Sequence, residues 1–182
     1  MPSQRKPLSR EASPRLTKMI PFLGQIPEGI IVDLACGYGR NGLVFVRSGR
    51  EVLFIDKDHD ALESIVNQNR QRGLNMNLIK TVRMDFNVEE PFFLSKSLAG
   101  LIVVHYFNEH LIGNILHKIK DGGFLYYESI DDRRGNYLEL PRRGWFDEQM
   151  SGNFKVLEYN QRVSKHDPNK CTVNILAIKS ES

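Results

Sequence analysis

The sequence predicts a three-layer α/β sandwich built around a mostly parallel, seven-stranded sheet. Its first five strands are expected at short apolar runs that are separated by segments with helical spacing. These runs are 30–34, 52–56, 78–82, 101–105 and 124–129. Several are apolar at nearly every position, as in strands buried on both faces of a parallel sheet, and strands alternating with helices form right-handed βαβ units. Two further runs, 154–163 and 172–179, are joined by SKHDPNK without a helical pattern, which predicts an antiparallel hairpin at the sheet edge.

Signals of helix ends lie between the apolar runs. The expected helices are 14–23, 41–48, 59–72 and 111–119. Ser13 followed by Pro14 predicts an N-cap and a first helical residue that needs no N–H donor. Asp58 is a suitable N-cap for the third helix, and Gly49 and Gly73 are suitable left-handed ends for the second and third. All segments between neighbouring runs of the parallel part are expected to be crossover helices.

The composition indicates one globular domain. The chain has 182 residues, of which 41% are hydrophobic and 26% are charged, and this balance excludes a disordered chain. We expect a flexible arm over 1–12 and a single domain over 13–182. No apolar run approaches the roughly 18–20 residues that cross a bilayer, and the polar N-terminus lacks a secretory core, so no membrane partner is expected. The two cysteines are too few for a disulfide framework and favour a reducing, cytoplasmic compartment.

The turn after the first predicted strand, DLACGYGRNG, contains the main ligand-binding signal. Gly37 and Gly39 allow a tight bend and a close approach of a ligand to the main chain. The helix that follows presents free N–H groups there. Asp56 ends the second run, where a carboxylate can hold a ribose diol, and Asp85, beside Phe86, follows the third and can accept a hydrogen bond from an exocyclic amine. Together these strand ends predict a nucleoside pocket.

Two kinds of nucleoside fit this pattern. GYGRNG matches the G-x-G-x-x-G turn of nicotinamide and flavin dinucleotide sites. Two features weigh against a dinucleotide. Asp33, four residues before Gly37, would attract a cationic amino group and repel a pyrophosphate, and the terminal antiparallel hairpin departs from a dinucleotide fold.

The sequence resembles the class I S-adenosylmethionine-dependent methyltransferases. The resemblance is carried by VDLACGYG, then FID, VRMDFN and LIVVHY, and by the terminal hairpin. Within that class, DLACGYGRNGLVFVRSGREVLFIDKD is similar to the tellurite-resistance methyltransferase group and its small bacterial relatives. The resemblance covers 8–179 and implies a Rossmann-like fold with S-adenosyl-L-methionine as the cofactor.

The resemblance also implies the residues that contact the cofactor. Asp33 and the backbone of the turn would surround its methionine part, Asp56 would bind the ribose hydroxyls with Lys57 beside it, and Asp85 would meet the adenine amine. Phe86 would donate a backbone N–H to the ring, and His105 would lie near the sulfonium. The implied turn residues are Ala35, Cys36, Gly37 and Gly39.

The sequence defines less clearly the part of the site that would bind the molecule receiving the methyl group, here called the acceptor side. We expect His105, Tyr106 and Glu128, at the ends of the fourth and fifth strands, to line it and to act in catalysis. A packed or solvated His105 and a structural Glu128 are the competing interpretations. HYFN at 105–108 replaces the Asn-Pro-Pro-Tyr-like tetrapeptide of enzymes that methylate exocyclic base amines, which counts against that reaction.

A methyltransferase acting on a small molecule is therefore the leading prediction. An RNA methyltransferase and an inactive cofactor-binding protein are the alternatives, although the net charge of +3 does not demand nucleic acid. The connection after the fifth strand is interpreted as a solvated loop or as a basic lid over an anionic substrate; its arginines are Arg133, Arg134, Arg142 and Arg143. The spacing of the histidines predicts no metal site, and the sequence leaves the oligomeric state open.

Overall fold

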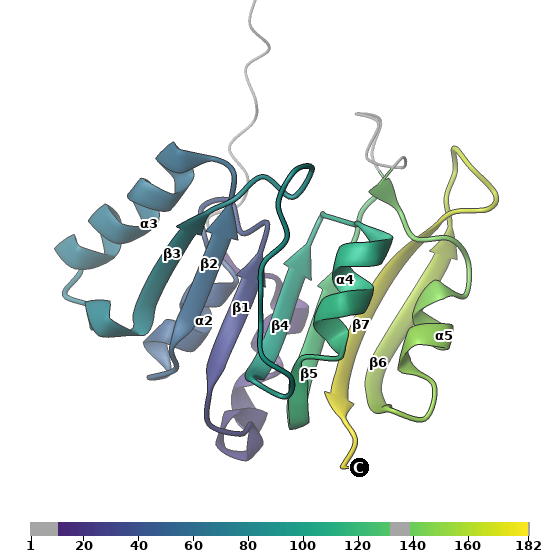
Figure 1. The fold of residues 1–182 in the computed structure, drawn as a ribbon, viewed down its shortest axis with the longest axis horizontal. Coiled ribbons are helices and arrows are strands. Elements are labelled where there is room, and N and C mark those ends of the chain that lie inside the picture. Colours follow the sequence, from purple (N-terminus) through teal and green to yellow (C-terminus); the bar gives the residue numbers. More distant parts are fainter. Residues whose placement is uncertain (1–10, 132–138, 182) are drawn as a thin grey trace, which may run out of the picture.

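The computed structural model describes residues 11–131 and 139–181, and most of the expected N-terminal arm lies outside them. The structure is a single seven-stranded sheet with the order β3-β2-β1-β4-β5-β7-β6 (Figure 1). The strands are β1 Ile30–Leu34, β2 Val52–Asp56, β3 Ile79–Arg83, β4 Leu98–Val104, β5 Ile119–Glu128, β6 Phe154–Val163 and β7 Cys171–Lys179. The first five are parallel, and β7 is antiparallel to both β5 and β6. The predicted fold class is therefore confirmed.

Helices cover both faces of the sheet and complete the three layers. The helical elements are α1 Pro14–Thr17, η1 Ile20–Gln25, α2 Gly42–Arg47, α3 His59–Gln71, η2 Met76–Leu78, α4 Glu109–Leu116 and α5 Trp145–Met150. The elements α1, α2 and α3 pack their apolar side chains on one face, against Phe54, Phe124 and Tyr126. The helices α4 and α5 cover the other face, in front of the sheet in Figure 1. None of the helices in the described ranges is long and apolar enough to span a membrane.

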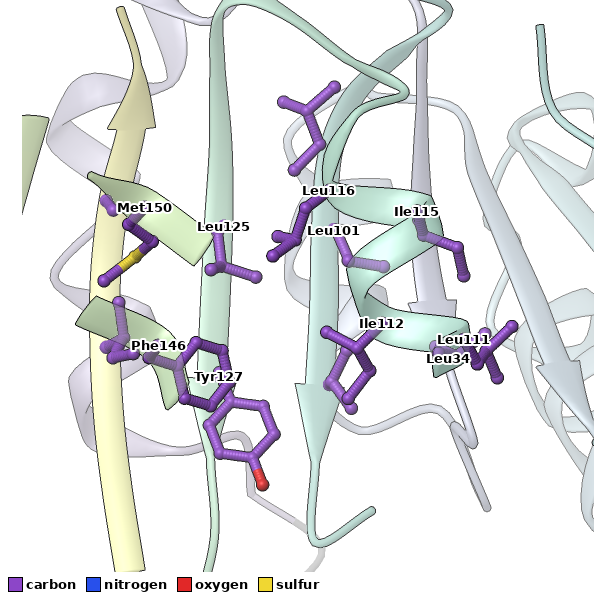
Figure 2. Close-up of a cluster of buried hydrophobic side chains, with 14 of the residues drawn as sticks. Leu34, Leu101, Leu111, Ile112, Ile115, Leu116, Leu125, Tyr127, Phe146 and Met150 are labelled. Atoms are coloured by element: carbon purple, nitrogen blue, oxygen red, sulfur yellow. The ribbon is translucent and has the colours of Figure 1, made fainter. Parts of the chain in front are cut away.

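The core under α4 and α5 is continuous and almost fully buried. Figure 2 shows the side chains of these two helices lying over β4 and β5, with Ile112 and Phe146 among them. Ile112 is 0% exposed and Phe146 is 1% exposed. Burial of one such side chain stabilises the fold by about 1.5–3 kcal/mol. This core fixes α4 and α5 against the sheet.

The structure corrects three expectations about the helices. The first helix ends at Thr17 and is followed by a 3-10 turn, because Pro21 has no N–H to donate to the carbonyl of Thr17. Ile119 belongs to β5, where it pairs with Leu98, rather than to the fourth helix. The connection 84–97, all of which is described, contains no helix. Its sequence has Pro91 at the centre and lacks a helical apolar period.

Replacing Gly100 with alanine is expected to lower the free energy of unfolding by about 2 kcal/mol. A Cβ at Gly100 would lie 2.1 Å from the ring of Phe124, and that ring is stacked on Phe45 with centroids 5.1 Å apart. Gly113→Ala in α4 is the control, because its nearest neighbour would lie at 3.6 Å and alanine favours a helix by about 0.5–1 kcal/mol. Urea denaturation measures both, and equal midpoints for wild type and Gly100→Ala would contradict the expectation.

Candidate functional site

The carboxyl ends of β1 and β4 carry a strained backbone. Ala35 follows β1 with a φ of 53°, and His105 follows β4 with a φ of 60°. Both values lie in the left-handed region that non-glycine residues rarely adopt, and such strain is concentrated at functional sites. The two strands are neighbours in the sheet, and the order of connections reverses between them, which is where ligands bind in open α/β sheets.

The glycine turn after β1 is tightly packed below and open above. Gly39 and Gly42 face the protein, since a Cβ at Gly39 would lie 2.7 Å from Ile65 and one at Gly42 would lie 2.6 Å from Phe54. Gly37 has a φ of 52°, and a Cβ placed there would have no atom within 4 Å. A ligand can therefore approach the main chain at Gly37. The packing role of Gly42 was not predicted, although Gly42 is the third glycine of the GYGRNG motif and could have been recognised from it.

Asp33 lies beneath the turn rather than on its open side. Its side chain is on the α2 face, the residue is 2% exposed, and Oδ2 accepts a hydrogen bond of 2.8 Å from the N–H of Gly42. Burial raises the pKa of Asp33 from 3.8 to about 7; the carboxylate of Asp56 acts in the same direction, while the N–H of Gly42 and the charge of Arg40 oppose it. The carboxyl group can thus change its charge near neutral pH.

Asp56 joins the end of β2 to the glycine turn. Its Oδ2 accepts a hydrogen bond of 2.7 Å from the N–H of Gly37, and Oδ1 accepts one of 2.9 Å from the N–H of Asp58. Each carboxylate oxygen has a further lone pair, so the same group can still accept bonds from a diol. The next residue, Lys57, is exposed, and its carbonyl accepts a bond of 3.3 Å from Nε of Arg83.

A hollow of about 380 Å³ lies at the ends of β2 and β3. It is lined by Lys57, Arg83, Met84, Asp85 and Glu89. Oδ1 of Asp85 accepts bonds from the backbone N–H and the side-chain amide of Asn87, at 3.0 and 2.8 Å. The ring of Phe86 lies 5.5 Å from the ring of Tyr106. Two of the predicted adenosine-side residues, Lys57 and Asp85, therefore line this hollow. A third, Phe86, contacts Tyr106, which was predicted for the acceptor side.

The three predicted acceptor-side residues share an edge of the sheet but not a face. The N–H of His105 donates a bond of 2.8 Å to the carbonyl of Glu128. Tyr106 packs on the core beneath α4, whereas Glu128 lies on the opposite face, the one that also holds Tyr126. The left-handed conformation of His105 redirects the chain between them.

The carboxylate of Glu128 ends a hydrogen-bonded chain that the sequence did not reveal. It accepts a bond from the hydroxyl of Tyr126, which lies 2.7 Å from Oγ of Ser13. The N–H of Ser13 donates a bond of 3.0 Å to Oδ1 of Asn41, at the start of α2. Ser13 therefore occupies the expected N-cap position before Pro14, but its side chain makes no capping bond to α1. No local pattern links Ser13 to Tyr126, because 113 positions separate them.

Two polar residues near α4 have structural partners. Arg142 pairs with Glu148, with Nη1 and Oε1 2.8 Å apart, and its Nε lies 3.8 Å from Glu109. Its charge is therefore compensated, which weakens the interpretation of this arginine as part of a lid over an anion. Asn108 caps α4 by accepting a bond of 3.0 Å from the N–H of Leu111. The other half of the predicted arginine loop, Arg133 and Arg134, lies outside the described residues.

The strand order, the glycine turn and the acidic ends of β1 and β2 define a Rossmann-like protein of the class I methyltransferase type. The sequence profile of the family described as tellurite resistance protein TehB matches residues 17–130, and the chain belongs to this family. It is accordingly a methyltransferase of the TehB-like group, as the sequence resemblance predicted. No curated protein sequence matches the chain.

Solved structures show the same fold at low sequence identity. TehB from Haemophilus influenzae is 14% identical, with a TM-score of 0.62 over 93% of this chain and 62% of that chain. Geranyl diphosphate C-methyltransferase from Streptomyces coelicolor A3(2), solved with S-adenosyl-L-homocysteine, is 12% identical, with a TM-score of 0.66 over 92% and 80%. YcgJ from Bacillus subtilis is 12% identical, with a TM-score of 0.65 over 92% and 98%. The chain thus spans less than two thirds of the Haemophilus protein.

Proposed function

We propose that the protein is an S-adenosyl-L-methionine-dependent methyltransferase that acts on a small-molecule acceptor in the cytoplasm. The bridge between Asp56 and the N–H of Gly37 is the observation that carries this proposal. It sets a diol-binding carboxylate against an open turn of main chain, as a nucleoside requires. The two cysteines, both free, support the reducing compartment.

The residues present fit the cofactor. The space above Gly37 leaves room for its backbone to be approached, and the hollow beside Asp85 lies next to Lys57, the neighbour of Asp56. Asp56 and Lys57 would hold the ribose side, and Asp85 and Phe86 would hold the adenine side. The turn from Ala35 through Cys36 to Gly39, with Asp33 beneath it, would hold the methionine side. When bound, the cofactor supplies an electrophilic methyl group on a sulfonium.

The contribution of the chain to such a reaction is mainly alignment and exclusion of water. Direct displacement requires the acceptor atom to be held in line with the methyl group, and fixed groups provide most of that advantage. His105 would take this role, and support for it comes from its strained backbone, whose N–H is bonded to the carbonyl of Glu128 at the edge of the sheet. Tyr106, packed on Phe86, would border the pocket from the α4 face, and Glu128 from the α1 face. A small acceptor is supported by the geranyl diphosphate enzyme of the same fold.

Calorimetry tests the cofactor assignment. S-adenosylhomocysteine is expected to bind, and NADH is not. A heat signal with NADH alone would support the dinucleotide alternative instead and would overturn the proposal.

A pair of glycine variants locates the binding site. Gly37→Ala and Gly49→Ala both place a side chain at a left-handed residue with nothing within 4 Å, at φ values of 52° and 83°. Each is expected to cost about 1–2 kcal/mol of stability through backbone strain. Only Gly37→Ala is expected to weaken S-adenosylhomocysteine binding, by about tenfold or more, because only that methyl group enters the ligand space. Equal affinities of the two variants would contradict the site.

A further inference from the structure

A buried hydrogen-bonded chain connects the acceptor side to the cofactor turn. Ser13 is 6% exposed and Tyr126 is 1% exposed, so both hydroxyl groups are removed from solvent. Glu128 lies at one end of the chain, and Asn41, the N-cap of α2, lies at the other. Buried polar groups that are fully bonded fix one arrangement of the surrounding side chains.

The chemistry of these groups determines which one donates and which one accepts in each hydrogen bond of the series. An ionised carboxylate only accepts hydrogen bonds, so the single proton of Tyr126 points to Glu128. Oγ of Ser13 must then donate to the hydroxyl of Tyr126, at 2.7 Å. Burial raises the pKa of Tyr126, so this phenol keeps its proton at neutral pH and remains a donor. Aligned donors of this kind strengthen one another.

At the end opposite Glu128, this series of hydrogen bonds reaches the residues beneath the glycine turn, where the cofactor would bind. The N–H of Ser13 is held by Asn41. The next residue, Gly42, donates its N–H to Asp33. The segment before α1 is therefore fixed to both halves of the carboxyl edge. Ser13 lies outside the βαβ units of the sheet, so its position here is not required to build them.

Resting on the proposed function, we infer that Ser13 and Tyr126 are positioning residues. They hold the carboxylate of Glu128, on the side of the site where the methyl acceptor would bind, in a state that accepts hydrogen bonds. A carboxylate held in this state favours an acceptor group that carries a proton, such as a hydroxyl or an amine. Charged and titratable groups on the neighbouring elements are Arg15 of α1 and His105 at the end of β4. The charge of Arg15 acts on Tyr126, and Arg15 pairs with Glu158 of β6 at 3.4 Å. The N–H of His105 is bonded to the carbonyl of Glu128.

The carboxyl signal of Glu128 tests this role without an acceptor. The protein is labelled with ¹³C at the glutamate carboxyl groups, and the signal of Glu128 is assigned by its absence in Glu128→Gln. The chemical shift of a carboxylate carbon responds to the hydrogen bonds that its oxygens accept, so Tyr126→Phe, which removes one donor, is expected to move the signal of Glu128 at neutral pH. Ser13→Ala is expected to move it less, and Ser13→Thr, which retains the hydroxyl, is expected to restore the wild-type position.

Tyr127→Phe is the matched control. Tyr127 is the next residue of β5, is equally buried at 0% exposed, and lies on the opposite face of the sheet. Tyr127→Phe should leave the carboxyl signal of Glu128 at its wild-type position. An equal signal position in Tyr126→Phe and Tyr127→Phe would overturn the inference. Should Tyr126→Phe fail to fold, an unchanged signal in Ser13→Ala would overturn it.

The acceptor class has a separate test. Wild-type protein is incubated with methyl-labelled S-adenosyl-L-methionine and fractions of cell extract, and the labelled product is identified by mass. The methyl group is expected on an oxygen or nitrogen that previously carried a proton. A product methylated on an atom that carried none would overturn the inferred class. Failure of the proposed function is distinguished from both results by calorimetry, as an absence of S-adenosylhomocysteine binding.

Discussion

Asp56→Asn is expected to lower the affinity for S-adenosylhomocysteine by about 10- to 100-fold, as measured by calorimetry. Hydrogen bonds to a charged group contribute about 1.5–3 kcal/mol each, and the ribose diol would donate to this carboxylate. Asparagine keeps the shape of the side chain and one oxygen, which can still accept the bond from Gly37 that spans 2.7 Å in the wild type. The turn is therefore expected to keep its conformation while the charge is lost.

Asp58→Asn is the control for this substitution. Asp58 is two residues further along and caps α3 by accepting a bond of 3.1 Å from the N–H of Ala61. Asparagine is as good an N-cap as aspartate. The equilibrium constants for unfolding and for S-adenosylhomocysteine binding should therefore each change by less than about twofold. A similar loss of affinity in both variants would assign the effect to the general charge of the loop and not to a bond from Asp56.

The parallel core of the fold was predictable because its signals are local. The run 52–56 is short and mostly apolar, which predicts a buried strand, and the structure has β2 at the same residues. The amino-terminal parts of β4 and β5 were missed. Residues 119–123 of β5 contain Lys120, Asp121 and two glycines, and only pairing with β4 makes this segment a strand. The helix between β3 and β4 was expected from the topology, and the residues there do not support one.

The cofactor side was likewise predictable, because topology places the ends of neighbouring parallel strands together. Asp56 and Gly37 needed only the strand assignments to be brought into contact. The acceptor side depends on events that no local pattern encodes. The left-handed residue His105 separates Tyr106 from Glu128, and the bond between Ser13 and Tyr126 joins residues that are 113 positions apart.

Asp33→Asn is expected to remove a pH dependence of stability that the wild type shows between about pH 4 and pH 7. The pKa of Asp33 is about 7 in the folded protein against an ordinary value of 3.8. Between these values the folded state binds one more proton than the unfolded state, so the free energy of unfolding falls as the pH rises. The contribution of Asp33 is full below about pH 4 and is lost through pH 7, at up to about 1.4 kcal/mol per pH unit. Urea denaturation at pH 5 and pH 7 should therefore show a fall in the wild type that is about 2 kcal/mol larger than in Asp33→Asn.

The same carboxyl group should link cofactor binding to pH. The amino group of S-adenosylhomocysteine is cationic and favours the ionised form of Asp33, so binding in the wild type should release a proton below about pH 7. The affinity is then expected to rise between pH 5.5 and pH 7, by up to about tenfold per pH unit, and to stay nearly constant in Asp33→Asn. The bond to Gly42, 2.8 Å long in the wild type, can be kept by the asparagine oxygen, so the variant retains the turn. A pH-dependent affinity that persists in Asp33→Asn would show that another group takes up the proton, and that Asp33 serves only to hold α2 against β1.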